Sequence, residues 1–110
     1  MEIITEDFVS FETAKLLKEK NCPDFGYSCI CDSEGNKAQT QSIIMKWLRE
    51  KECVICVIPL TFYFGENVSS WGYNIWAGNN LEVDEENTPK FTTYEDAVEA
   101  AIKYCLEHLI

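Results

Sequence analysis

Hydrophobic residues recur at three- and four-residue spacing over the last eighteen positions, 93–110, and this period predicts an amphipathic helix. Thr93 is followed three residues later by Asp96, a pattern typical of a helix start. Because this is the clearest element of the chain, we expect the other segments to pack around it. Its apolar face consists of Tyr94, Ala97, Val98, Ala101, Ile102, Cys105, Leu106 and Leu109, and its outer face of Glu95, Glu99, Lys103 and Glu107.

The same spacing predicts two helices earlier in the chain. One begins at Ser10, a residue type that caps helix N-termini, and ends before Pro23. The other begins after Thr40 and ends near Glu52, with charged residues outside its apolar face. The apolar positions are Ala14, Leu16 and Leu17 in the first helix, and Ile43, Ile44, Trp47 and Leu48 in the second.

Runs of β-branched and aromatic residues bounded by turn formers predict strands. A short strand over residues 27–31 precedes a cluster of turn formers at 32–36. Residues 53–58 are apolar throughout, as expected for a strand that is covered on both faces. We expect Pro59 to interrupt the hydrogen-bond ladder of this strand, because proline has no N–H to donate.

The second half of the predicted sheet follows this proline. Residues 60–64 can continue the strand as an edge, and 71–76 alternate as its antiparallel partner. Residues 81–89 carry too few apolar side chains for a core element and predict an exposed connection or a short edge strand. The order of elements predicts one α+β domain over residues 1–110, with an antiparallel sheet of three or four strands against two or three helices. The C-terminal helix is expected to lie at its centre.

Charge and cysteine content narrow the classes of function. Nineteen acidic residues against nine basic ones give a formal net charge of −10, which disfavours direct binding to nucleic acid and to anionic membranes. The N-terminal residues are acidic, where a secretory signal would carry lysine and a long apolar stretch. We therefore expect a cytoplasmic protein whose six cysteines are thiols.

The cysteines and the single histidine offer little chemistry. Cys29 and Cys31, with Cys53 and Cys56, could supply four thiolates to zinc, but strand alternation would send the last two to opposite faces. The same geometry argues against a redox pair. His108 is one turn from the C-terminus, where an imidazolium complements the helix dipole. We prefer this capping role to a catalytic one. We assign no catalytic, metal-binding or cofactor-binding residue and expect a protein that is not an enzyme.

Three stretches together resemble a known family. They are Glu6-Asp7-Phe8-Val9-Ser10-Phe11-Glu12-Thr13-Ala14, then Met45-Lys46-Trp47-Leu48-Arg49-Glu50-Lys51, and finally Thr93-Tyr94-Glu95-Asp96-Ala97. They are similar to an opening, a middle helix and a closing helix in small acidic proteins of gut bacteria, their phages and mobile elements. The family has no assigned activity, so the resemblance transfers no catalytic residue. It implies a cytosolic protein that is related to phages or mobile elements.

The remaining features favour a non-catalytic module that binds an unidentified protein partner. Trp71 and Tyr73 are expected to face the last helix as core, while Trp76 can be exposed. An acidic stretch follows it closely, and aromatic anchors beside charged rims are typical of interaction surfaces. The alternative is an acidic mimic of DNA that inhibits a nucleic-acid enzyme. The sequence leaves the oligomeric state open. The predicted partner surface consists of Trp76, Glu82, Asp84, Glu85 and Glu86.

Overall fold

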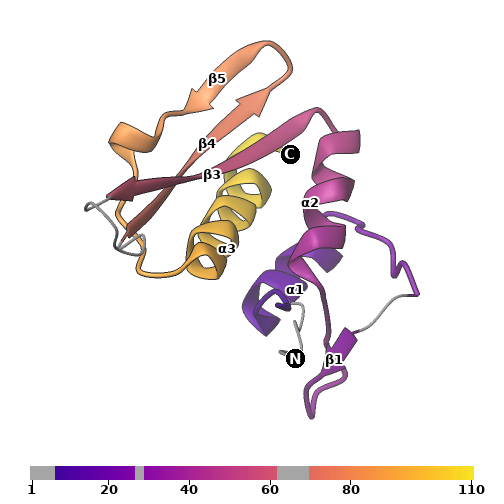
Figure 1. The fold of residues 1–110 in the computed structure, drawn as a ribbon. Coiled ribbons are helices and arrows are strands. Elements are labelled where there is room, and N and C mark those ends of the chain that lie inside the picture. The colour runs from indigo at the N-terminus through magenta and orange to yellow at the C-terminus, as the bar shows by residue number, and fades with distance from the viewer. Residues whose placement is uncertain (1–6, 27–28, 62–69) are drawn as a thin grey trace.

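The computed structural model describes residues 7–26, 29–61 and 70–110, and over these residues the chain forms three α-helices and two antiparallel sheets. This confirms the predicted α+β class and the packing of the C-terminal helix against the sheet (Figure 1). The expectations for residues 27–28, and for the strand continuation over 62–64, fall outside the described residues.

The larger sheet has three strands in the order β3-β4-β5. β3 (Cys53–Thr61) and β4 (Ser70–Ala77) are the strands predicted from residues 53–58 and 71–76. The acidic stretch after them forms β5 (Asn80–Val83) and a short 3-10 helix, η1 (Glu85–Asn87). A two-residue turn with Gly78 at φ 61° joins β4 to β5, so the predicted short edge strand is present.

The prediction that Pro59 interrupts the β3 ladder is met only in part, because the pairing shifts register between Pro59 and Thr61 but the strand does not end at Pro59. On β4, Trp71 uses both its N–H and its C=O to bond Phe91, at 2.8 and 2.9 Å, on the side away from β3. Pro59 is the residue opposite Trp71, so this pair is one that exchanges no hydrogen bonds. The nitrogen of Pro59 therefore faces away from β4. Because no ladder bond is lost there, β3 continues to Thr61.

A second, smaller sheet pairs β1 (Cys29–Cys31) with β2 (Lys37–Gln39). Sequence reasoning predicted the first strand and the turn but missed β2, because three residues are too few to display a period. Asp32 organises the turn by accepting hydrogen bonds from the backbone N–H groups of Glu34 and Asn36, at 3.0 and 2.8 Å. The Asn36 side chain and these N–H groups lower the pKa of Asp32.

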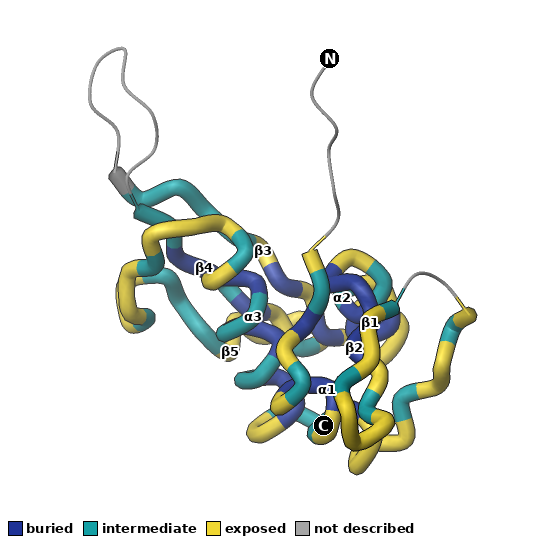
Figure 2. The backbone as a smooth tube through the Cα atoms, turned by 90° about the horizontal axis from the view of Figure 1, so that it is seen from below, coloured by how far each residue is buried: buried dark blue, intermediate teal, exposed yellow. Residues whose placement is uncertain are grey.

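The C-terminal helix α3 (Tyr94–Tyr104) lies between the larger sheet and the other two helices (Figure 1). Figure 2 shows the buried stretches of the backbone meeting where α3, β3, β4 and α2 come together. Thr93 Oγ1 accepts from the Asp96 N–H at 3.1 Å, which confirms the predicted start. The wholly buried side chains of α3 are Ala97, Val98, Ala101 and Ile102, and those of Cys105 and Leu106, directly after it, are wholly buried too.

The end of this helix differs from the prediction of one regular α-helix to Ile110. From Cys105 to Leu109 the chain forms a π-helical segment, η2, and the Ile110 N–H bonds the Cys105 carbonyl at 3.1 Å. Tyr94 also departs from the apolar face to which it was assigned, because it is exposed. Its ring instead stands at 87° to that of Trp71, with centroids 5.4 Å apart.

The two earlier helices are α1 (Phe11–Glu19) and α2 (Gln41–Glu50). Ser10 caps α1 as predicted, since its side chain accepts from the Thr13 N–H at 3.1 Å. Thr40 occupies the predicted cap position of α2, but its hydroxyl lies 3.3 Å from the hydroxyl of Ser42 and makes no cap bond. The Gln41 N–H bonds the Asp7 carbonyl at 2.8 Å instead.

Glu99 joins α3 to the start of α1, which contradicts its predicted place on the outer face. Its Oε1 accepts from the Ser10 N–H at 2.9 Å and from the Thr13 hydroxyl at 2.6 Å. In a capping box, a Glu three residues after the cap bonds the cap N–H, but here that position is Thr13. Glu99, from a distant helix, takes this role. Lys103 strengthens the same seam by an ion pair with Glu12 at 2.9 Å.

We expect Glu99→Ala to lower the free energy of unfolding by about 1–3 kcal/mol, because it leaves the Ser10 N–H and the buried Thr13 hydroxyl without their acceptor. Denaturant unfolding measures this change. Glu107→Ala is the matched control, since Glu107 is exposed on the next part of the same helix and should shift stability by less than about 0.5 kcal/mol. Equal stability of the two variants would contradict the cap.

Candidate functional site

The three-stranded sheet has an inner face toward α3 and an outer face toward solvent. Tyr73 and Ile75 are buried on the inner face, and Tyr73 stacks on Phe91 with ring centroids 6.0 Å apart. Trp71 lies on the same face and is half-buried against Tyr94. Period-two alternation sends Trp76 outward. The predicted core position is confirmed for Tyr73, whereas Trp71 faces the same side but is not part of the hydrophobic core.

A row of three large apolar side chains crosses the outer face. Val54 on β3 and Leu81 on β5 are the residues directly opposite Trp76 in the two ladders. Their exposed fractions are 38% for Val54, 39% for Trp76 and 42% for Leu81. Opposite residues of antiparallel strands have neighbouring Cβ atoms on one face, so this row is continuous. We call these three residues the outer row.

The other half of the outer face is partly covered. Leu60 lies across Gly72, where an added Cβ would stand only 2.8 Å from its Cδ1 atom. The side chain of Asn74 accepts from the Glu85 N–H at 2.8 Å, and this bond holds η1 against the sheet. The open part of the face is therefore the end that carries the outer row.

The structure divides the predicted acids into two kinds. Glu82 and Glu86 are exposed, and Glu82 is the extra residue where the pairing of β4 and β5 shifts register. Asp84 and Glu85 are half-buried, and Asp84 caps η1 by accepting from the Glu86 N–H at 3.0 Å. Glu82 and Glu86 are thus the acids available to a partner, whereas Asp84 serves the local fold.

Sequence reasoning missed two members of the outer row, Val54 and Leu81. Val54 was assigned to a strand that is covered on both faces, and this assignment is wrong because its side chain is exposed. The missed signal was register, because pairing Ile55 with Ile75 places Val54 opposite Trp76. A hairpin turn at Gly78 fixes the position of Leu81 in the same way.

The charged side chains of residues 52–89, the segment that contains the larger sheet, are all acidic. Residues 52–89 contain no lysine, arginine or histidine, so nothing in this segment neutralises its acids. The ion pairs that the structure describes, Lys15–Glu34, Lys37–Asp24 and Lys103–Glu12, all join residues outside this segment. A positively charged partner is therefore attracted most strongly toward the sheet. The acids of the segment are Glu52, Glu66, Glu82, Asp84, Glu85 and Glu86.

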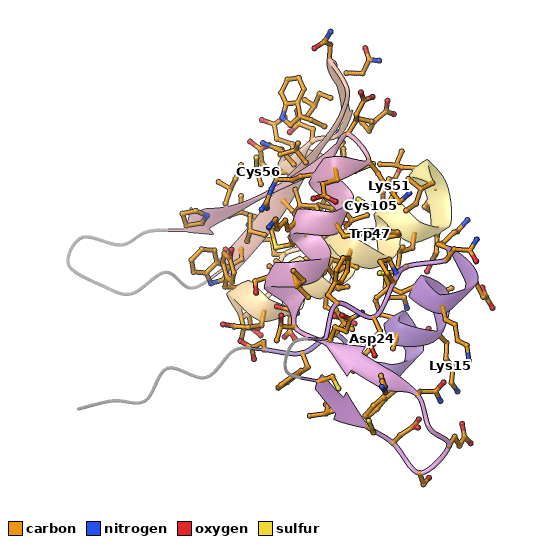
Figure 3. All side chains as sticks on the ribbon, turned by 90° about the vertical axis from the view of Figure 1, so that its right-hand side faces the viewer. Lys15, Asp24, Trp47, Lys51, Cys56 and Cys105 are labelled. Carbon is orange, nitrogen blue, oxygen red and sulfur yellow. The ribbon has the colours of Figure 1, made fainter. Side chains whose placement is uncertain are left out.

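The two cysteine pairs of the candidate zinc site lie on different sheets. Cys53 is buried and Cys56 exposed, which confirms that alternation sends them to opposite faces. In Figure 3, Cys56 lies on the larger sheet, whereas Asp24 and Lys15 lie at the other end, beside the β1–β2 hairpin that carries Cys29 and Cys31. Among the described residues, no three His, Cys, Asp or Glu side chains are grouped to hold a metal ion.

Burial keeps three of the thiols protonated. It raises the pKa of Cys105 to about 12, an effect to which the neighbouring Cys53 adds. Burial also raises the pKa of Cys53, although its hydrogen bond with Cys105 opposes the shift. Cys22 lines a cavity of about 230 Å³ with Leu17 and Lys37, and burial raises its pKa to about 11. None of these three is an activated nucleophile.

His108 and a group of acids at the other end of α3 are the remaining candidates for acid–base chemistry. His108 is exposed in η2, and its ring lies against Tyr104 with centroids 4.6 Å apart. An acidic cavity beside the start of α3 contains Asp7, Glu95 and Glu99. Burial, and then the charge of Glu95, raise the pKa of Asp7. Ser10 also lines the cavity, and its hydroxyl caps α1 by accepting from the Thr13 N–H and donating to the Thr13 hydroxyl.

Comparisons with protein-family models, with curated proteins and with solved structures gave no match to this chain. No helix within the described ranges has the length and hydrophobicity needed to cross a bilayer. The fold and the surface are therefore the features that characterise this protein. It is a small α+β protein with an open, apolar sheet end that is bordered by acidic residues.

Thiol labelling tests the assignment of the cysteines. We expect Cys31 and Cys56, which are exposed, to react with iodoacetamide in the native protein, while Cys53 and Cys105 react only after unfolding. Mass spectrometry of the peptides after a short reaction gives the labelled fraction at each site. The same experiment with a chelator should give an unchanged pattern, and fast labelling of Cys105 in the native state would contradict its burial.

Proposed function

We propose that this protein is a non-catalytic interaction module whose outer row binds a positively charged partner protein. The observation that carries the proposal is the alignment of Val54, Trp76 and Leu81 on an open sheet face beside exposed acids. Tryptophan is enriched among the residues that dominate binding energy, and acidic rims steer basic partners. None of these three side chains belongs to the hydrophobic core.

The same proposal places the protein in the cytoplasm. Its six cysteines are free thiols in the structure, an arrangement suited to a reducing compartment. The family resemblance supports a role in phages or mobile elements. Direct binding to nucleic acid is disfavoured by the net charge of −10.

A second candidate is an acidic inhibitor that mimics DNA. The absence of basic residues from positions 52–89 favours it, because a mimic must present acids without interruption. The position of the outer row is the argument against it, since three exposed apolar side chains occupy the middle of this acidic surface. Salt separates the candidates, because binding by mimicry should disappear at high ionic strength while apolar anchoring persists.

We expect Trp76→Ala to remove the partner from a quantitative pull-down and to weaken its purified complex by about 2 kcal/mol or more, as truncation of an anchoring aromatic does. Ile30→Ala is the matched control, because Ile30 is 42% exposed but lies on β1, in the other sheet. Proteins that both variants retain equally are not ligands of the outer row. Loss of the partner from Ile30→Ala alone would overturn the proposal.

The charge variant should combine Glu82→Gln with Glu86→Gln and leave Asp84 intact, because Asp84 caps η1. We expect slower association with the partner at low salt, and little change in the melting temperature, since exposed charges contribute little to stability. Stopped-flow association at two salt concentrations measures the effect. An unchanged rate at low salt would remove these acids from the surface.

A further inference from the structure

The free edge of β3 is a feature of the sheet that the outer row does not use. β3 pairs with β4 on one side, and within the described ranges no strand pairs with its other side. Figure 1 shows β3 leaving the end of α2 and running away from it along the margin of the sheet. The strand has nine residues and no charged side chain. Long uncharged edges are templates for pairing with another chain.

The ladder determines which backbone groups face this edge. Pro59 lies in a pair without hydrogen bonds, and the register has no shift between Cys53 and Pro59. Ile55 and Val57 are two and four residues before Pro59, so their pairs are of the same kind. Their N–H and C=O groups therefore point away from β4, and they have no hydrogen-bond partner among the residues that the structure describes.

Proline limits this edge at one end. Pro59 offers only a carbonyl to the free side, and the register shifts after it, before Thr61. Proline and irregular pairing are devices that block unwanted strand addition. The unprotected length is therefore the part of β3 before Pro59, where Ile55 and Val57 each present one donor and one acceptor.

The outer side chains of β3 extend the apolar surface up to this edge. Val54 and Cys56 are exposed and Ile58 is half-buried, and all three lie on the outer face. A strand that pairs with β3 would place every second side chain beside them. Apolar residues at these alternate positions would gain contact with Val54 and, through it, with the outer row.

A second copy of this chain and a basic segment of another protein are the two candidates for pairing with the edge, and they differ in charge. A second copy of this chain would bring another net charge of −10 to a sheet segment that already has six acids and no base. A basic segment would instead be attracted by that field. Charge complementarity therefore favours a positively charged strand from a different protein over self-association.

We propose that the free edge of β3 accepts an extended, positively charged segment of the partner as a fourth strand, paired to the backbones of Ile55 and Val57. This inference rests on the proposed function and names the form in which the partner binds. In such strand addition, backbone hydrogen bonds supply affinity, and alternate side chains supply specificity.

The probe is a short synthetic peptide of alternating valine and lysine. Nuclear magnetic resonance should show its binding at the amides of Ile55 and Val57, and hydrogen exchange of these two amides should slow. A peptide of the same sequence with an N-methyl group at every residue has no backbone N–H to donate to the edge and should not bind. Equal binding of the methylated peptide, or of a peptide with glutamate in place of lysine, would overturn the proposal.

Substitution of Val57 tests the edge from the side of the protein. Val57→Pro removes an N–H that faces the free edge, and we expect it to weaken peptide binding about three- to tenfold relative to Val57→Ala. The alanine variant is the control, because it also loses valine packing but keeps the N–H. Melting curves establish that both variants fold, and exchange of the Val57 amide in the wild type decides the question if the proline variant does not.

The two proposals can fail separately. If Trp76→Ala abolishes partner binding while the peptide fails to protect Ile55 and Val57, the outer row stands and the edge does not. If the peptide binds and Trp76→Ala changes nothing, the edge stands without the outer row. A dimer in sedimentation equilibrium that Val57→Pro dissociates would assign the edge to a second copy of the chain and overturn the basic partner.

Discussion

Complete burial of one side of α3 is the constraint on which the other elements depend. Ala97 and Ala101 have no exposed surface, and such small residues let strands approach a helix closely. Ile102 and Leu106 are also fully buried, and each side chain of this size contributes about 1.5–3 kcal/mol when it leaves water. β3 and β4 pack on α3, as do α1 and α2, and the β1–β2 hairpin packs on α1.

This arrangement explains why polar contacts concentrate where α1 meets α3. A hydroxyl that is buried where two helices meet cannot rely on water for its hydrogen bond, so the neighbouring helix must supply an acceptor. Glu99 Oε1 does so for the fully buried Thr13, whose hydroxyl donates to it, and it also accepts from the Ser10 N–H. Thr13 is therefore tolerated in the core because an acceptor from α3 satisfies its hydroxyl.

Local signals predicted the helix starts well, and contacts between distant residues account for the errors. Ser10 and Thr93 cap their helices by bonds to residues three positions away, so the sequence contains both partners of each bond. The effect of Pro59 depends on the hydrogen-bond phase of a neighbouring strand, which no local pattern contains. The place of Glu99 depends on a helix 86 to 89 residues away.

The candidate surface, too, could be predicted from the sequence only in part. Trp76 and Glu82 could be located from the sequence because they are near one another along the chain and follow a strand pattern. Val54 could not, since only the register of β3 with β4 brings it beside Trp76. The capping role of Asp84 was not predicted, because a carboxylate at a short helix start is as well suited to capping as to binding.

Because β3 carries both the free edge and Val54 of the outer row, the two features together constrain the register of a bound segment. Val54 belongs to the row through its side chain, and its strand neighbour Ile55 presents its backbone to the open edge. A partner segment that pairs with the backbone is therefore held in one register relative to the row, because a shift by one residue would turn its apolar side chains to the other face. Backbone pairing alone accepts many sequences, and apolar contact alone accepts many orientations. Used together on β3, as we propose, they would select a segment by both its alternation and its register.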